Sequence, residues 1–240
     1  MPAYVRDSIA QMPLTKQEAS MLKFNRSIKA SLVAAVMVTG LSAHANLLQN
    51  GGFEDVNGAP LQGWGGYTYG TGYGAMAGWL VNSGTVDITT NSTQWSPAFE
   101  LTHALDLNGD NTGSISQSFN TVSGAQYSLS FQYSKNVAGS PDPSTAEVKL
   151  YGTGFTTWTD TLSVTNAQAG TPNSMLWTGY APHSFTGTGN PITLEFTSTV
   201  GGSGGVFLDA VAVVPEPEGY ALALAGLGVL GGLRARRRKA

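Results

Sequence analysis

The stretch QYSLSFQY, residues 126–133, decides the fold class. Its aromatic and apolar side chains fall on alternate residues with polar side chains between them, which is the period of a β-strand with one wet face. The stretch ITLEFTS, residues 192–198, alternates in the same way. Both patterns predict strands that cover one shared core.

Turn sequences such as Asn57-Gly58 and Asn108-Gly109 separate further segments with strand character. No convincing amphipathic helix lies among these segments, which are residues 85–89, 104–108, 113–119, 147–151, 176–181 and 206–213. We therefore expect an all-β domain, a single jelly-roll β-sandwich. The Gly–aromatic run at residues 63–79 and the GGSGG stretch at 201–205 are expected to be loops.

The chain contains no cysteine, which excludes disulfides, thiol catalysis and Cys-based zinc sites. Its charge is unevenly distributed, because ten of the twelve Lys and Arg residues lie before residue 46 or after residue 213. Residues 46–213 contain two lysines against eleven Asp and Glu, a net charge of 2 − 11 = −9. Such a domain has no basic patch to neutralise phosphates, so nucleic-acid binding is excluded.

The N-terminal 45 residues are typical of a targeting segment. Residues 1–20 are expected to be an upstream extension, which is either disordered or precedes a true start at Met21. Residues 21–45 combine a basic start with the apolar stretch 30–42 and two small residues, Ala43 and Ala45. This order predicts a secretory signal peptide that is cleaved before Asn46, with the Sec machinery and signal peptidase as partners. A short buried helix is the alternative.

The C-terminal segment, residues 214–240, has three parts. The first part is an extended motif, Val214-Pro215-Glu216-Pro217, and the second is the apolar stretch 219–233. The third is a basic tail, residues 234–240, which contains Arg234, Arg236, Arg237 and Arg238. A helix of fifteen residues spans only about 22 Å, less than the ~30 Å of a bilayer core. The arginines hold the end on the cytoplasmic side.

This segment resembles the PEP-CTERM sorting signal. The resemblance implies membrane contact through the C-terminal hydrophobic helix, followed by recognition and cleavage by an integral-membrane exosortase. A permanent single-span anchor is the alternative. With the signal-peptide helix at the other end, we expect a β-sandwich over residues 46–213 between two targeting helices.

The domain itself resembles the choice-of-anchor C family of bacterial surface proteins. The resemblance rests on NLLQNGGFED at 46–55, GWLVNSGTVDI at 78–88, residues 113–136 and FLDAVAV at 207–213. Its opening and closing strands are also similar to galactose-binding jelly rolls, including carbohydrate-binding modules. The resemblance implies a displayed or secreted β-sandwich and no established catalytic activity.

Glu54 and Asp209 are the candidate metal ligands. Modules similar to this one often place an early acidic residue and a last-strand Asp around a structural calcium, and calcium accepts such carboxylates. Asp209 lies in an apolar strand, where Phe207 and Val211 are expected on its own face, and a carboxylate there needs a cation or donors. The alternative is that both carboxylates cap turns or bond backbone amides.

Exposed aromatic rings are the candidate contacts for an extracellular polysaccharide, because sugar faces pack on such rings. The aromatic set includes Trp79 and Trp95, which the family pattern places in the core, as well as Trp158 and Trp177. Within the Gly-rich run the candidates for glycan stacking are Trp64, Tyr67, Tyr69 and Tyr73. The alternative is aromatic packing under a long loop.

Catalysis has little support in the sequence. No HExxH, paired-His or GxSxG pattern is present, and Asp106 with Asp110 is the one imaginable pair of carboxylates. We therefore expect an exported, non-enzymatic protein of a Gram-negative cell surface or exopolysaccharide matrix, with a structural or adhesive role. The alternatives are a carbohydrate-binding module with a defined sugar site and a surface hydrolase.

Overall fold

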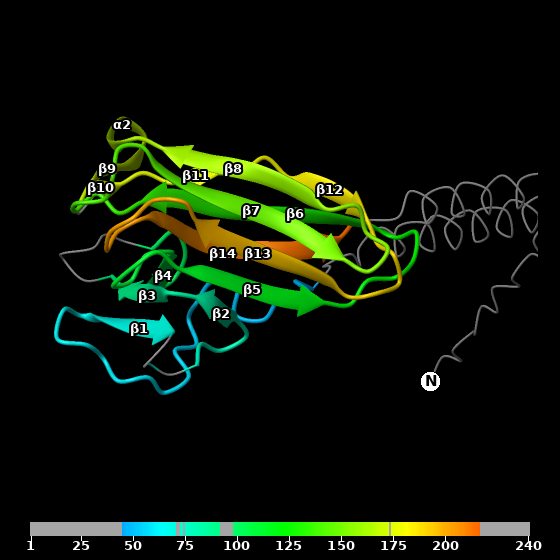
Figure 1. The fold of residues 1–240 in the computed structure, drawn as a ribbon, viewed down its shortest axis with the longest axis horizontal. Coiled ribbons are helices and arrows are strands. Elements are labelled where there is room, and N and C mark those ends of the chain that lie inside the picture. The colour runs from blue at the N-terminus through cyan, green and yellow to red at the C-terminus, as the bar shows by residue number, and fades with distance from the viewer. Residues whose placement is uncertain (1–44, 71–72, 74, 92–97, 173, 217–240) are drawn as a thin grey trace, which may run out of the picture. The chain divides into compact units, whose positions relative to one another are not determined.

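The protein is a β-sandwich of two antiparallel sheets packed face to face (Figure 1). The computed structural model describes residues 45–70, 73, 75–91, 98–172 and 174–216. The expected upstream extension, signal peptide and apolar tail therefore lie outside the described residues. Among the residues that are described, no helix is long and apolar enough to cross a membrane.

One sheet, sheet A, has the strand order β1-β3-β4-β14-β6-β11, with β12 also paired to β6. Its strands are β1 (Gly66–Gly70), β3 (Thr85–Thr90), β4 (His103–Asp106), β6 (Gln126–Lys135), β11 (Thr178–Gly179), β12 (His183–Thr186) and β14 (Val206–Pro215). The other, sheet B, has the order β2-β5-β13-β7-β8. Its strands are β2 (Leu80–Ser83), β5 (Ser114–Phe119), β7 (Ser144–Gly152), β8 (Trp158–Val164) and β13 (Ile192–Ser198).

Successive strands mostly cross from one sheet to the other. β4, β5, β6 and β7 alternate between sheets A and B, and so do β12, β13 and β14. This alternation is the connectivity of a jelly roll, so the predicted fold class is confirmed. Three short elements lie at one end of the sandwich: the helical turn α2 (Asn166–Ala169) and the paired strands β9 (Gly170–Thr171) and β10 (Ser174–Met175).

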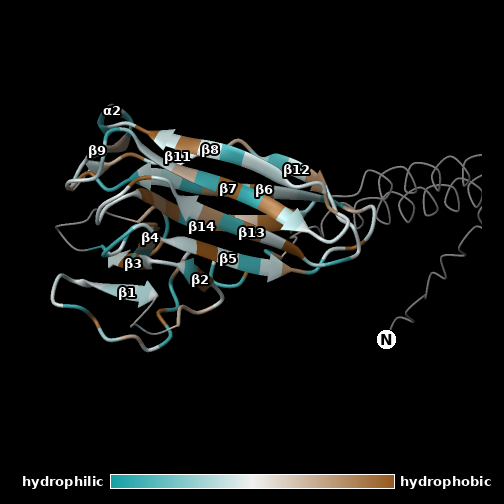
Figure 2. Ribbon diagram, in the orientation of Figure 1, coloured by the Kyte–Doolittle hydropathy of each residue, from teal (hydrophilic) through white to brown (hydrophobic). Residues whose placement is uncertain are grey.

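The core lies between the sheets and follows the predicted alternation. Tyr127, Leu129 and Phe131 of β6 and Leu194 and Phe196 of β13 are buried, while the residues between them are more exposed. Figure 2 shows the same bands of hydrophobic and hydrophilic residues along β7 and β13. Apolar burial of this extent, at about 25 cal/mol per Å², supplies the main driving force for a domain without disulfides.

The Gly–aromatic run is not wholly a loop, which corrects the expectation for residues 63–79. Residues 66–70 form β1, which pairs with β3 from Gly66 opposite Thr89 to Gly70 opposite Thr85. Close packing explains the glycine at position 66, because an added Cβ would lie 2.1 Å from the indole of Trp64. The strands β2, β8 and β12 were also not predicted, and of residues 176–181 only β11 is a strand.

The last strand carries a β-bulge that changes which side its residues face. Its pairing with β6 shifts register between Asp209 and Ala212, and Ala210 has a positive φ of 50°. As a result Val211 joins the core cluster, whereas Phe207 packs against Trp177 outside that cluster. The expectation that Val211 shares a face with Asp209 is therefore wrong, because a bulge inserts one unpaired residue.

The beginning of the domain is bonded to its end. Asn46 donates from Nδ2 to the carbonyl of Val211 and accepts the amides of Leu48 and Val213 on Oδ1. The amide of Leu47 donates to the carbonyl of Val213. Asn46, the residue that the sequence predicts to follow signal-peptide cleavage, is thus bonded to the last strand of the domain.

Candidate functional site

A groove of about 510 Å³ opens between the edges of the two sheets. We call it the Trp158 groove; it is lined by residues 154–158, which lead from β7 into β8, and by residues 183 and 186–188 of β12 and the turn after it. Because β8 ends sheet B and β12 lies beside β6 in sheet A, the groove is built by elements far apart in sequence.

Aromatic rings form the wall of the Trp158 groove. The rings of Trp158 and His183 stack with centroids 3.8 Å apart and planes 14° from parallel. Phe155 stands edge-on to Phe185, at 5.9 Å, which ties the groove to the core. The rings are thus held by packing, and such preorganisation lowers the entropy lost when a ligand binds.

Hydroxyl groups surround these rings. Among the described residues, neither the Thr156 nor the Thr157 hydroxyl has a hydrogen-bond partner, and both side chains are exposed. The Thr186 hydroxyl accepts a hydrogen bond from Gln126, and Thr188 donates to the carbonyl of Thr153. The groove therefore offers ring faces together with free donors and acceptors.

The electrostatics of the groove favour a neutral imidazole. Burial lowers the pKa of His183, and the Asp160 carboxylate opposes that change only in part. Asp160 accepts a hydrogen bond from Tyr180, whose ring stacks on Phe131 at 4.4 Å. Burial, followed by the bond to Asp160, raises the pKa of the Tyr180 phenol. The phenol is therefore a neutral donor at physiological pH.

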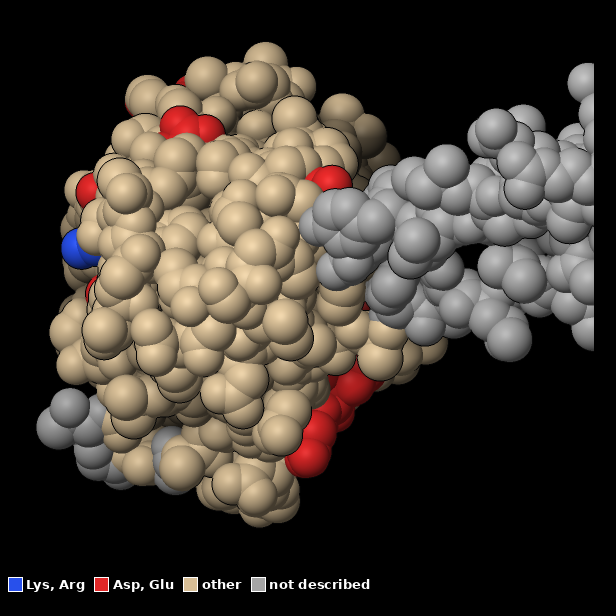
Figure 3. Space-filling model, turned by 90° about the vertical axis from the view of Figure 1, so that its right-hand side faces the viewer, with Lys and Arg blue, Asp and Glu red and all other residues tan. Residues whose placement is uncertain are grey.

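The surface around the groove carries little charge. Figure 3 views the sandwich from the end at the right of Figure 1, where most of the visible described surface is neither acidic nor basic and the largest group of Asp and Glu atoms lies at the lower right. Of the two lysines in the domain, Lys135 is 0% exposed and bonds the Pro141 carbonyl and the Asn166 side chain. Lys149 alone remains as a surface cation among the described residues.

The predicted glycan-stacking residues do not form one exposed platform. Tyr69 is 0% exposed and donates its hydroxyl to the carbonyl of Val56, so its proposed stacking role is wrong. Tyr67 is partly buried against the core, and Trp64 is partly buried over Gly66. Tyr73 is 44% exposed and donates to Asp110. Trp79 lies in the core, as expected, whereas Trp95 lies outside the described residues.

Glu54, one of the two predicted calcium ligands, has its acceptor positions filled by protein donors. Oε1 accepts the amides of Thr102 and His103, both at 2.9 Å. Oε2 accepts the Thr102 hydroxyl and lies 2.8 Å from His103 Nδ1. Although partial burial acts to raise the pKa of Glu54, these bonds outweigh it and lower the pKa below its usual value.

Asp209, the other predicted ligand, is buried and bonds backbone amides. Its Oδ2 accepts the amides of Phe99 and Glu100, and its Oδ1 accepts the amide of Ala210. Burial nevertheless raises the pKa of Asp209 to about 7. Asp209 lies on the same side of β14 as Phe207, away from the core cluster, and there it meets the segment that begins at Phe99.

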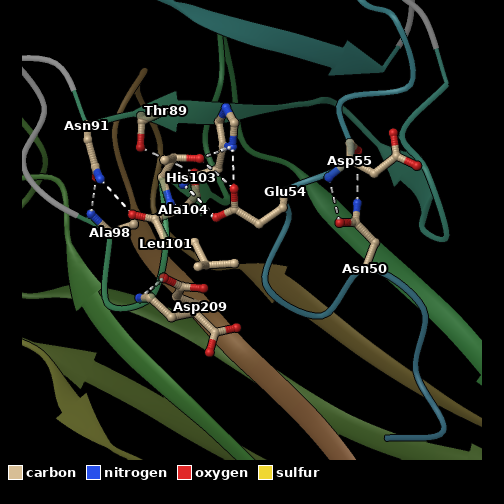
Figure 4. A network of polar contacts seen from close by, with 12 residues as sticks. Asn50, Glu54, Asp55, Thr89, Asn91, Ala98, Leu101, His103, Ala104 and Asp209 are labelled. Atoms are coloured by element: carbon tan, nitrogen blue, oxygen red, sulfur yellow. Dashed lines mark hydrogen bonds and ion pairs between the residues drawn. The ribbon is translucent and has the colours of Figure 1, made fainter.

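Glu54 and Asp209 therefore bracket one segment, residues 98–103, from its two ends, as Figure 4 shows. This is the alternative arrangement, in which both carboxylates bond backbone amides. Because calcium needs free oxygen ligands, the filled acceptors of Glu54 do not fit the shared calcium site that the resemblance implied. Among the described residues, no group of three or more His, Asp or Glu is placed to hold a metal.

Asp106, half of the imagined catalytic pair, is enclosed by the domain. Its Oδ1 accepts the amides of Asn108 and Gly205, and its Oδ2 accepts Asn136 Nδ2. Burial raises its pKa to about 7. Asp110 is exposed at the surface, so the two carboxylates do not face a common space that a substrate enters.

Part of the sorting motif belongs to the sandwich. Val214 and Pro215 are the last residues of β14, and Glu216 is bonded to β6 and β12. Pro217 and the basic residues Arg234, Arg236, Arg237 and Arg238 lie outside the described residues. Ala43 of the predicted signal-peptidase site also lies outside them, whereas Ala45 is the first described residue and is exposed.

The sequence did not single out the Trp158 groove. Trp158 belongs to the wider aromatic set, but nothing in the sequence pointed to His183, because its stacking partner Trp158 lies far earlier in the chain on a strand that was not predicted. The run Thr156-Thr157-Trp158 beside a glycine is the one local sign of the site. This run can be interpreted as part of a site only when the fold shows that β8 and β12 line the same groove.

Two protein families match parts of the chain. Residues 46–214 match the family described as "Protein of unknown function (DUF642)", and residues 213–239 match the PEP-CTERM protein-sorting motif. The motif indicates export and surface sorting with exosortase processing, as the sequence predicted. Membership of the choice-of-anchor C family stays a prediction. No curated protein matches the chain.

Several solved structures share the general chain path. They include TmCBM61 in complex with β-1,4-galactotriose, at 16% identity and a TM-score of 0.45, covering 72% of this chain and 99% of that chain. A family 16 carbohydrate-binding module has 17% identity and a TM-score of 0.43, with 70% and 99% covered. A Stig cyclase from Fischerella sp. TAU has 16% identity and a TM-score of 0.49, with 73% and 99% covered. At these values the likeness assigns no activity to this chain.

Proposed function

The chain belongs to the DUF642 family and carries a PEP-CTERM sorting motif, and from this premise we propose that it is a non-catalytic, polysaccharide-binding protein. It acts at the surface or in the exopolysaccharide matrix of a Gram-negative cell, where it has an adhesive or structural role. The Sec machinery, signal peptidase and an exosortase process it on the way. The Trp158 groove is its sugar site.

The stacked pair of Trp158 and His183 is the observation that carries the proposal. Pyranose rings present a face of C–H groups that packs on aromatic rings, and their hydroxyls need nearby hydrogen-bond partners. The groove has both kinds of contact, because the free hydroxyls of Thr156 and Thr157 lie beside the ring wall. Its volume of about 510 Å³ falls in the range of small-molecule sites.

The charge of the domain favours a neutral polysaccharide. Burial lowers the pKa of His183, which favours its uncharged form at neutral pH, and Asp160 lies nearby on β8, the strand that carries Trp158. With Lys149 as the surface cation of the described domain, a polyanionic chain meets net repulsion. We therefore expect neutral hexose polymers to bind more tightly than uronate-rich ones.

Affinity electrophoresis through gels that contain neutral or uronate-rich polysaccharides tests this proposal. We expect Trp158→Ala to weaken binding of the neutral polymer about tenfold, which corresponds to about 1.4 kcal/mol. Trp64→Ala is the matched control, since Trp64 is also partly buried but lies on the Gly-rich segment; it is expected to change binding less than twofold. Equal losses in both variants would contradict the assignment of the groove.

A purely structural role is the second candidate, favoured by the close packing of the predicted platform residues Tyr69 and Tyr67. It predicts no retardation of the wild-type protein in any polysaccharide gel. The hydrolase alternative predicts release of reducing sugar that is lost in Asp106→Asn. We expect no such release, because Asp106 is enclosed by its three donors.

A further inference from the structure

Lys135, the last residue of β6, places an amine in the interior of the sandwich. Its side chain is 0% exposed, and lysines are almost never fully buried without a close ionic partner. Among the described residues, the one carboxylate within 4 Å is Asp142, whose Oδ1 lies 3.7 Å from Nζ and whose side chain is 45% exposed. The hydrogen bonds of Nζ go instead to two neutral acceptors, the Pro141 carbonyl at 2.7 Å and Asn166 Oδ1 at 2.8 Å. A close ion pair therefore does not explain this lysine.

The contact between Lys135 and Asn166 joins the two sheets. Lys135 ends β6 in sheet A, whereas Asn166 begins α2, the helical turn that follows β8 at the edge of sheet B (Figure 1). Asp142 lies against both residues, since its Oδ1 also accepts the backbone amide of Asn166 at 2.9 Å. An amine, a carboxamide and a carboxylate from three separate segments are thus held together.

These three groups are suited to an exchange of one amide for another. A lysine attacks a carbonyl carbon only as the free amine, so a neighbouring base must first accept a proton from the ammonium. Asp142 is the carboxylate within reach of Nζ. Because Oδ1 is bonded directly to Cγ, an amine in contact with Asn166 Oδ1 also lies beside the carbon that it attacks. Such fixed proximity replaces an encounter in solution.

We propose that Lys135 and Asn166 form an intramolecular isopeptide bond. The Nζ–Cγ bond forms and the Cγ–Nδ2 bond breaks, so the Asn166 amide nitrogen leaves as ammonia. Nζ gives up two protons through Asp142: one completes the departing ammonia, and the other converts it to ammonium. Asp142 ends as the carboxylate that it was, and no oxidant, cofactor or second protein takes part.

The bond gives the domain a covalent tie that its composition otherwise denies it. The chain has no cysteine, so no disulfide can link sheet A to sheet B. A bond between residues 135 and 166 closes a loop in the unfolded chain, which stabilises the folded state as a disulfide does. This inference is independent of polysaccharide binding, because none of its residues lines the Trp158 groove.

Trypsin digestion of the denatured protein, purified from its own host, tests for the bond. Residues 46–213 contain Lys135 and Lys149 as their only trypsin sites, and trypsin does not cut after an acylated lysine. We expect wild type to release less than about a tenth as much of the peptide 136–149 as Asn166→Ala, in which no bond can form. A greater release overturns the proposal. Asn166 is exposed, so this variant keeps the core intact.

Mass spectrometry of the undivided wild-type fragment gives a second readout. After allowance for hydrolysis at Lys149, the loss of one ammonia lowers the mass by about 17 Da. An uncut Lys135 without this loss overturns the cross-link, because another modification then blocks trypsin. Asn190→Ala is the matched control, an exposed asparagine whose side chain also makes a hydrogen bond. It is expected to keep both the mass loss and the resistance at Lys135.

The same digestion tests Asp142 as the base. Asp142→Ala leaves Lys135 and Asn166 in place but removes the group that accepts the proton, so we expect it to release at least about ten times more of the peptide 136–149 than wild type. Asp55→Ala, at another exposed aspartate, is expected to release no more than wild type. Equal release from Asp142→Ala and wild type overturns the role of Asp142.

Discussion

The buried carboxylate of Asp106 makes the stability of the domain depend on pH. Its pKa is about 7 in the folded protein, against 3.8 for an ordinary Asp, because burial disfavours the charged form more than its hydrogen bonds favour it. Between pH 4 and 7 the folded chain keeps a proton that the unfolded chain has released. The free energy of unfolding therefore falls as pH rises through this window and levels off above pH 7.

The size of the effect follows from the difference of about three pKa units. At 1.36 kcal/mol for each unit, Asp106 alone makes unfolding about 4 kcal/mol easier at pH 8 than at pH 4. Asp209, also raised to about 7, acts in the same direction. In a domain of this size about 4 kcal/mol lowers the melting temperature by roughly 10 °C.

Urea unfolding of the purified protein, followed by tryptophan fluorescence at pH 5 and pH 8, measures this difference. We expect the midpoint to be higher at pH 5. Asp106→Asn removes the titrating group and should reduce the gap between the two midpoints, whereas the exposed Asp55→Asn should leave it unchanged. A midpoint that is equal at both pH values, or higher at pH 8, would refute the reasoning.

Three further predictions concern particular side chains. Millimolar calcium should raise the melting temperature by less than about 1 °C, because the acceptors of Glu54 are filled; calorimetry that finds a rise of several degrees would contradict this. Lys135→Ala should cost about 3 kcal/mol in urea unfolding, since it removes a fully buried side chain together with its two hydrogen bonds, whereas Lys149→Ala should cost less than about 0.5 kcal/mol. Gly205→Ala should also destabilise the domain, because its Cβ would lie 2.2 Å from a buried amide oxygen; Gly201→Ala, which meets nothing within 4 Å, should be neutral in the same assay.

The alternation of apolar and polar residues predicted the strands whose two sides differ most in hydrophobicity. β6 and β13 alternate strictly, so their inward residues, such as Leu129 and Leu194, follow from the sequence alone. β1 was missed because glycines flank Tyr67-Thr68-Tyr69 and leave an alternating stretch of only three residues, so its strand state depends on pairing with β3. The bulge at Ala210 was missed for a related reason, since one extra residue in a strand leaves no compositional sign.

The sites were harder to predict than the strands. The sequence identified Glu54 and Asp209 as carboxylates that need partners, but those partners lie on a segment between them whose path is set by the whole sandwich. The stack of Trp158 on His183 depends on two sheet edges that meet only in the folded domain. The sorting motif was recognisable because its three parts are contiguous, yet its pairing with β6 was not.

The position of β14 in sheet A has a consequence for the timing of export. This strand lies between β4 and β6, so the two halves of sheet A cannot pair until the last residues of the domain have left the membrane. A chain that crosses the membrane from its N-terminus presents Leu208 and Val213 only after every other strand. We therefore expect sheet A to close only after β14 has emerged. The order of the strands in the sequence would thus make completion of this sheet the last step of folding during export.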